Sequence, residues 1–204
     1  MRKNANPYGK TDKYTLSLIQ IAHDAGAMDA TVIAPDNIIV EDKLAKLCKD
    51  PGCENYGLSM SCPPHVSGPD GFRKLLKNYD KAIVFKIDVP YSALFSSERD
   101  DWFRLLHEIA SGIEHGVVKM GYQNSKAFAG GSCKQIFCSK YIDCEVVARN
   151  GKCRNPEYAR PSMSGFGINV KKLMKQAGFK LDDSETQPNN KPSVGALSGL
   201  VLVG

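Results

Sequence analysis

Seven cysteines form two clusters and are the residues of this chain best suited to carry chemistry. The first cluster comprises Cys48, Cys53 and Cys62, separated by four and eight residues. The second comprises Cys133, Cys138, Cys144 and Cys153, separated by four, five and eight residues. The thiols have three interpretations: buried apolar side chains, disulfides or a catalytic thiol pair, and metal ligands.

The surrounding residues favour metal ligation. Cysteines that are buried for packing lie on the apolar face of helices and strands, whereas these lie among Lys, Asp, Gly, Pro and Asn. An odd cysteine count, the lack of a recognisable export signal and a chain long enough for its own core disfavour structural disulfides. A catalytic thiol pair is disfavoured because the sequence contains no Cys-x-x-Cys.

The spacing favours an iron–sulfur cluster over zinc. Structural zinc sites use tight cysteine pairs about two to four residues apart, because the ligands share one small ion. Gaps of four, five and eight residues suit a wider [4Fe-4S] cube. We predict that Cys133, Cys138, Cys144 and Cys153 hold such a cluster, and Zn²⁺ is the alternative.

The first cluster predicts a second, incomplete metal site. Its last cysteine begins the run CPPH, and a proline directly after a ligand cysteine is typical of ferredoxin-type sites. The thiolates of Cys48, Cys53 and Cys62 leave one corner for His65, a distant residue or an exogenous ligand, and we expect a structural role for His65. An open corner predicts that chemistry occurs here, with electrons supplied by the four-cysteine site. The alternative is that only Cys53 and Cys62 contact anything.

Residues beside the second cluster have predicted supporting roles. Gly130 and Gly131 precede Cys133 and would let backbone N–H groups approach cluster sulfurs. Arg154 and Arg160 follow Cys153 and would neutralise an anionic cluster. The two arginines could alternatively receive an anionic substrate.

Three blocks, CKDPGCENYGLSMSCPPH, FAGGSCKQIFCSKYIDC and CRNPEYARPSMSGFGINV, resemble the prokaryotic family of predicted metal-binding proteins known as domain of unknown function 2284. The resemblance covers residues 30–178. It implies a cysteine-rich metal site of iron–sulfur type in organisms that are often anaerobic, and it implies no established reaction. All seven cysteines carry over as metal ligands.

The family resemblance also matches Cys-Arg-x-Pro and Arg-Pro-Ser-Met signatures, here formed by Arg154, Pro156, Arg160, Pro161, Ser162 and Met163. After this point the family usually reads Glu-Ala and then a glycine-isoleucine-aspartate segment. This chain has Ser164, Gly165 and Phe166 followed by GINV. The carboxylate that the family has at this point, a candidate for acid–base chemistry, is therefore missing.

Apolar periodicity predicts an alternation of helices and strands, and hence an α/β or α+β class. Strands are expected near 30–40, at 81–90, at 126–131 and at 195–204. Helices are expected at 41–48, 70–80, 96–117 and 168–179. The best of them, 96–117, has a predicted cap at Ser96 or Ser97 and a predicted apolar stripe of Trp102, Leu105, Leu106, Ile109 and Ile113.

Length and composition fit one soluble domain, 1–204, with cysteine-rich loop excursions at 48–65 and 133–163 and a polar loop at 181–193. We expect a cytoplasmic protein, because no stretch reads as a signal peptide or a membrane span. The net charge of +5 comes with no dense basic run, which disfavours nucleic acid as a partner. The expected partner is a redox protein or a small-molecule substrate.

Overall fold

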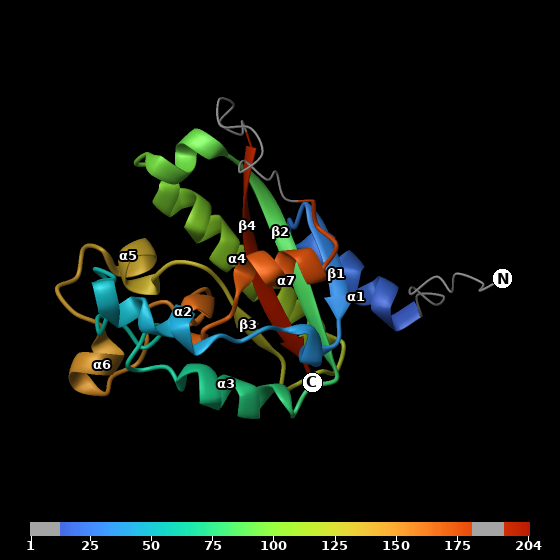
Figure 1. The fold of residues 1–204 in the computed structure, drawn as a ribbon, viewed down its shortest axis with the longest axis horizontal. Coiled ribbons are helices and arrows are strands. Elements are labelled where there is room, and N and C mark those ends of the chain that lie inside the picture. The colour runs from blue at the N-terminus through green and yellow to red at the C-terminus, as the bar shows by residue number, and fades with distance from the viewer. Residues whose placement is uncertain (1–12, 181–193) are drawn as a thin grey trace.

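The computed structural model describes residues 13–180 and 194–204, in which a four-stranded antiparallel sheet lies between two layers of helices (Figure 1). The strand order is β1-β2-β4-β3. The strands are β1 Asp29–Ile33, β2 Lys81–Pro90, β3 Lys126–Phe128 and β4 Val194–Val203. This sheet places the protein in the α+β class, the second of the two predicted classes.

The two long central strands pair along their whole length, from Lys81 opposite Val203 to Pro90 opposite Val194. Their β-branched and aromatic residues suit a pleated, buried surface. Because side chains alternate between the faces of a strand, Phe85 lies in one hydrophobic cluster and Val84 in the other. Each face of the sheet therefore needs a layer of helices to cover it.

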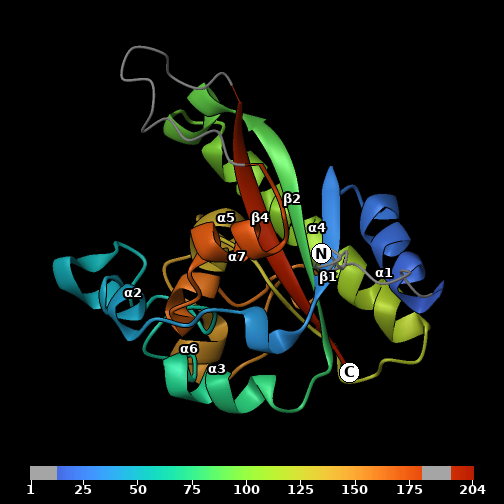
Figure 2. The same cartoon turned by 45° about the vertical axis from the view of Figure 1, so that its right-hand side comes forward.

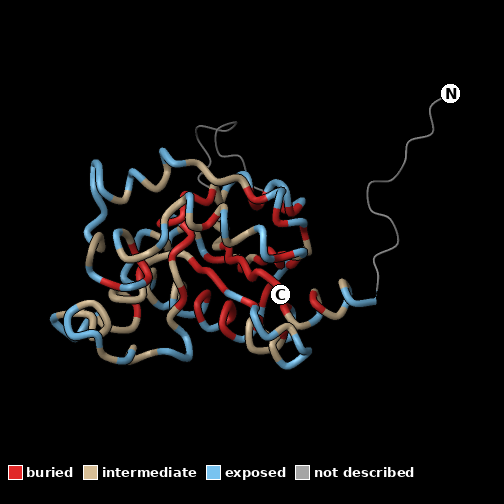
Figure 3. The backbone as a smooth tube through the Cα atoms, turned by 90° about the horizontal axis from the view of Figure 1, so that it is seen from below, coloured by how far each residue is buried: buried red, intermediate tan, exposed pale blue. Residues whose placement is uncertain are grey.

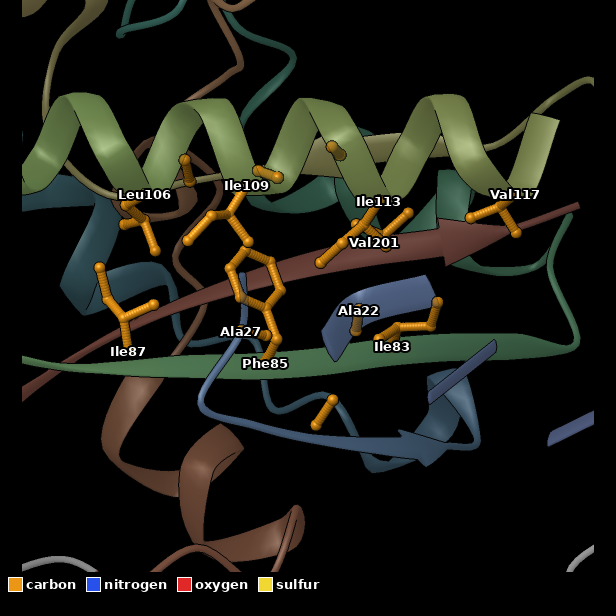
Figure 4. Close-up of a cluster of buried hydrophobic side chains, with 14 of the residues drawn as sticks. Ala22, Ala27, Ile83, Phe85, Ile87, Leu106, Ile109, Ile113, Val117 and Val201 are labelled. Carbon is orange, nitrogen blue, oxygen red and sulfur yellow. The ribbon is translucent and has the colours of Figure 1, made fainter. Parts of the chain in front are cut away.

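One face is covered by α1, Lys13–Asp24, and α4, Arg99–Lys119. Four residues of α4 point at β2 and β4 around Phe85 (Figure 4): Leu106, Ile109, Ile113 and Val117. Their spacing of three and four residues is that of one helix face. The predicted stripe was wrong at Leu105, which lies off this face and is 38% exposed.

The opposite face is covered by α3, Gly68–Leu76, by α7, Val170–Gln176, and by a 3₁₀ turn, Met163–Phe166. Here Phe72, Phe128 and Phe166 form a mutual aromatic contact with ring centroids 5.2–5.3 Å apart. These tilted and edge-to-face arrangements are the preferred geometries of aromatic pairs. Figure 3 shows buried residues concentrated in the centre of the molecule.

The remaining short elements gather at one side of the sheet, in or next to the two cysteine segments (Figures 1 and 2). They are α2 Asp42–Lys46, a π-type turn Cys48–Gly52, α5 Cys133–Cys138 and α6 Glu145–Arg149. Two further 3₁₀ turns span Pro35–Asn37 and Tyr91–Phe95.

Four sequence predictions about elements need correction or have no structural outcome. Helices α5 and α6 contradict the expected lack of helix in the second cysteine segment; each is too short to show periodicity. Helix α1 was not predicted at all. Glu98, not Ser96 or Ser97, is the N-cap of α4, although the Ser96 hydroxyl accepts from the Glu98 amide at 3.1 Å. The polar loop 181–193 lies outside the described residues.

Candidate metal centre

The four cysteines of the second cluster line one small cavity of about 20 Å³. Helix α5 carries Cys133 at its first residue and Cys138 at its last. Cys144 is the N-cap of α6, and Cys153 follows that helix. The chain thus returns to one place three times within about twenty residues, as the spacing suggested. A cavity of this size holds about one water molecule, and we call it the closed site, with each of its four cysteines partly exposed at its rim.

Each of these four sulfurs faces a hydrogen-bond donor. The Ser61 hydroxyl donates to Cys133 Sγ at 3.1 Å. Asn155 serves two sulfurs: its backbone N–H donates to Cys153 Sγ at 3.4 Å and its Nδ2 to Cys138 Sγ at 3.3 Å. The amides of Val147 and Met60 donate to the sulfur of Cys144. Donors directed at every sulfur suit thiolates, which accept hydrogen bonds more strongly than thiols do.

Burial and hydrogen bonding shift the pKa values of these thiols in opposite directions. Burial raises the pKa of Cys133 to about 11, although the hydroxyls of Ser61 and Ser59 act to lower it. Burial also raises the pKa of Cys144, but the amides of Val147, Met60 and Val146 outweigh it, so the pKa lies below its usual value. A cation bound among the sulfurs would favour the thiolate form of both.

An ion-pair network shapes the loop around this cavity. The Arg149 guanidinium binds both carboxylate oxygens of Asp143, at 2.9 and 3.0 Å. Arg154 lines the cavity, pairs with Glu145 at 2.5 Å and stacks over the Tyr141 ring at 4.2 Å. Arg154 therefore lies where the sequence predicted it, beside the thiols, but it already has a carboxylate partner.

The three cysteines of the first cluster line a separate and much larger cavity of about 390 Å³. Cys62 is buried, Cys48 is partly buried and Cys53 is exposed. Burial raises the pKa of Cys48, and the neighbouring thiols Cys53 and Cys62 add to the shift. The opposite wall comes from α4, which contributes Arg99, Phe103 and Leu106. The size falls within the range of small-molecule sites, about 300–1,000 Å³.

The two cysteine sites touch each other through a pair of Ser-Cys dipeptides. Ser61 Oγ lies 3.1 Å from Cys133 Sγ and 3.8 Å from Cys62 Sγ. Cys62 Sγ in turn lies 3.5 Å from Ser132 Oγ. Each serine thus contacts the cysteine of the other segment, so one hydroxyl group separates a sulfur of the first site from a sulfur of the second.

Gly130 and Gly131 line the larger cavity, not the four-cysteine cavity for which the sequence suggested them. A Cβ atom on Gly130 would lie 2.9 Å from the Phe103 ring, and one on Gly131 would lie 3.0 Å from it. Gly131 also has a φ of +78°, in the left-handed region. Close packing against Phe103 explains why both positions are occupied by glycine.

Arg160 lines neither cysteine cavity. Its guanidinium pairs with Glu114 of α4 at 2.7 Å, and its backbone N–H donates to Nδ1 of the buried His107 at 3.1 Å. Nε2 of His107 is 3.0 Å from the Gly130 carbonyl and donates to it. Burial lowers the pKa of His107 to about 4, so this histidine is neutral at pH 7. Its ring also packs edge-on against Phe137, which lines the four-cysteine cavity, with 5.5 Å between the ring centroids, so His107 contacts a wall residue of each site. The sequence missed this link.

His65 lies beside the first cluster, where its Nε2 is 3.2 Å from the Gly57 carbonyl. It does not line the three-cysteine cavity. In the part of the chain that the structure describes, no group of three or more His, Cys, Asp and Glu side chains is arranged to hold a metal ion.

Sequence reasoning also missed the donors and the wall residues. Ser59, Ser61 and Asn155 surround the sulfurs of the second cluster although two of them belong to the first cysteine segment. A signal was present, because Ser-Cys occurs at 61–62 and again at 132–133. Arg99 and Phe103 gave no signal, because their place in the cavity depends on how α4 packs.

Taken together, the fold and the cysteine-lined cavities define an α+β protein with two adjacent thiol sites. The chain belongs to the family described as "Predicted metal-binding protein (DUF2284)", whose model matches residues 31–203. This match confirms the resemblance noted in the sequence and supports a metal cofactor. No curated protein and no solved structure matched the chain. Within the described residues, no helix is long and apolar enough to cross a membrane.

Proposed function

We propose that this chain is an iron–sulfur redox protein with two metal sites of different character. Cys133, Cys138, Cys144 and Cys153 would hold a [4Fe-4S] cluster, and Cys48, Cys53 and Cys62 would hold a second one with an open corner. The observation that carries the proposal is the four-cysteine cavity, in which every sulfur accepts a hydrogen bond. Sulfur-directed hydrogen bonds are a principal means by which proteins tune iron–sulfur potentials.

The chemical character of the ligands supports iron–sulfur or zinc binding, since both prefer thiolates. Iron–sulfur is favoured because the cysteine gaps are wider than those of structural zinc sites. When bound, such clusters supply one-electron transfer, and a vacant corner adds a position for a substrate atom.

Different residues of the chain would serve the two sites. Asn155, Ser61 and the Met60 amide stabilise thiolates in the closed site, and Arg154 lowers the cost of their negative charge. The Ser61 hydroxyl, in contact with Cys133 and close to Cys62, provides the short link between the sites. The larger cavity would admit a substrate beside Cys53 and exclude bulk water with its apolar walls.

The test is metal analysis of protein purified without oxygen. The proposal predicts a brown protein that contains iron and acid-labile sulfide in equal amounts and bleaches in air. A zinc-stabilised interaction module is the alternative, and it predicts a colourless, air-stable protein. Zinc in place of both iron and sulfide would overturn the proposal.

A further inference from the structure

The larger cavity has a distinctive distribution of charge. Only two of the residues that line it carry charged side chains, Glu54 and Arg99. The walls are otherwise apolar or neutral, and Phe103 and Leu197 supply partly exposed apolar surfaces. Sites of this composition bind small organic molecules through their apolar part and orient them with a few polar groups. A cluster held by the three cysteines would occupy part of the volume, so its neighbour must be small.

Arg99 has binding capacity that the fold does not use. Among residues 13–180 and 194–204, its closest carboxylate is Asp100 at 3.9 Å, and no hydrogen bond to its guanidinium is found. The Asp100 carboxylate is instead engaged by Gln135 Nε2, at 3.0 and 3.4 Å. The guanidinium stacks over the Phe103 ring, 4.7 Å from its centroid. Stacking fixes its plane and leaves its N–H fork available.

A hydrogen-bond chain joins the start of α4, where Arg99 lies, to the first cysteine segment. Asn55, between Cys53 and Cys62 in sequence, donates to Gln135 Oε1 at 3.0 Å. Gln135, in α5, donates to Asp100 at the start of α4. The three side chains tie the first cysteine segment, α5 and α4 together beside the cavity. The arginine and the three cysteines therefore belong to one preorganised site.

We propose that this cavity binds a small organic carboxylate, with Arg99 holding the carboxylate and Phe103 and Leu197 contacting its apolar part. A planar guanidinium matches a carboxylate through two parallel hydrogen bonds. A single cation among apolar walls suits one carboxylate better than a phosphate, which needs more donors. Glu54 is exposed and disfavours a second anionic group. This inference rests on the proposed function in assigning the carboxylate as the redox substrate.

The experiment uses fluorinated probe pairs with protein purified without oxygen. Each pair is an anion and its neutral amide: trifluoroacetate with trifluoroacetamide, and 4-fluorobenzoate with 4-fluorobenzamide. Binding is measured by ¹⁹F NMR line broadening for the wild type, Arg99→Gln, Arg99→Lys and Lys119→Gln. Lys119 is an exposed cation at the other end of α4 and serves as the matched control. Iron and sulfide are measured on the same samples.

We expect at least one anion to bind about tenfold more tightly than its amide, as charge-assisted hydrogen bonds imply. Arg99→Gln should remove this preference, Arg99→Lys should keep part of it, and Lys119→Gln should leave it unchanged. The inference is wrong if no anion is preferred, or if Arg99→Gln and Lys119→Gln behave alike. It is also wrong if Arg99→Gln changes only the iron content, because Arg99 would then serve the cluster alone.

These outcomes separate the inference from the proposed function. Arg99-dependent binding to a protein that contains zinc would leave the carboxylate site standing and overturn the iron–sulfur proposal. Iron and sulfide without Arg99-dependent binding would support the iron–sulfur proposal and overturn the carboxylate site.

Discussion

The two cysteine sites differ in how completely the protein encloses and satisfies them. The four-cysteine site is a cavity of about 20 Å³ in which every sulfur has a hydrogen-bond donor and an ion-pair network fixes the loop. The three-cysteine site opens onto about 390 Å³ and includes the exposed Cys53. A closed, hydrogen-bonded site suits electron storage, and an open one suits chemistry on a ligand.

The two cysteine sites also depend on each other for their structure. The segment between Cys53 and Cys62 supplies Ser59, Met60 and Ser61 to the surroundings of the four-cysteine site. The segments are therefore interleaved, and a change in one should be measurable in the other.

Removal of the metal should have the largest effect, and it should act unequally on the molecule. The cysteine segments contribute little to the two hydrophobic clusters on the sheet, so their order depends more on ligands. We expect limited proteolysis of metal-free protein to cleave first within 133–160 and to leave α4 and the sheet intact. Even cleavage along the chain would contradict this division.

Replacement of His107 should have the next largest effect, because this residue joins both sites. His107→Ala would leave the partly buried Gly130 carbonyl and the buried Arg160 N–H without their hydrogen bonds to this side chain. We expect the free energy of unfolding to fall by about 3 kcal/mol, from two lost hydrogen bonds and a buried void. His107→Gln, which retains polar atoms, should lose less. Urea denaturation at pH 7 measures the free energy of unfolding of both variants. Equal and small losses would show that the hydrogen bonds of His107 do not stabilise the fold.

His107 also predicts a pH dependence of stability. Its pKa is about 4 in the folded protein and near 6.5 when unfolded, so the unfolded state binds the extra proton between these values. The stability should therefore decrease as the pH falls from about 6.5 to 4, by up to roughly 3 kcal/mol for this residue. Denaturation at several pH values compares the wild type with His107→Gln. The prediction fails if their difference in stability does not change with pH.

A smaller effect is expected for Ser61→Ala, which removes the donor to Cys133 and preserves the fold around it. Loss of one hydrogen bond to a charged sulfur, worth about 1 kcal/mol, should lower the reduction potential of the four-cysteine site by roughly 40 mV. Ser164→Ala is the control, because Ser164 lines only the larger cavity. Redox titration followed by EPR would compare the two. Equal shifts would mean that Ser61 has no special contact with the cluster.

The sequence predicted best where a periodic pattern was long. Helix α4 and strands β2 and β4 follow from apolar spacing, because burial on one or two faces leaves a clear repeat. Helices α5 and α6 span six and five residues, too few for any period to emerge. Helix α1 was not predicted, because its apolar patch LSLIQIA is short and interrupted by polar residues.

The structure brings each cysteine cluster to its own cavity, but the sequence did not predict the neighbours of the cysteines, and the role of the cysteines as metal ligands stays a prediction. Arg160 lies seven residues from Cys153, yet it turns to Glu114, because the chain folds back against α4 between them. Ser61 and Arg99 reach their sites only through the packing of distant segments. Sequence spacing carries no information about such contacts.

The most direct test of the two-site account compares Cys53→Ser with Cys138→Ser by iron content and EPR. The wild type should contain about eight iron atoms per chain if both sites hold [4Fe-4S] clusters. Cys53→Ser should lose about half of them and retain the EPR signal of the closed site, and Cys138→Ser should lose that signal. Unchanged iron in Cys53→Ser would contradict the account, because the first three cysteines would then hold no cluster.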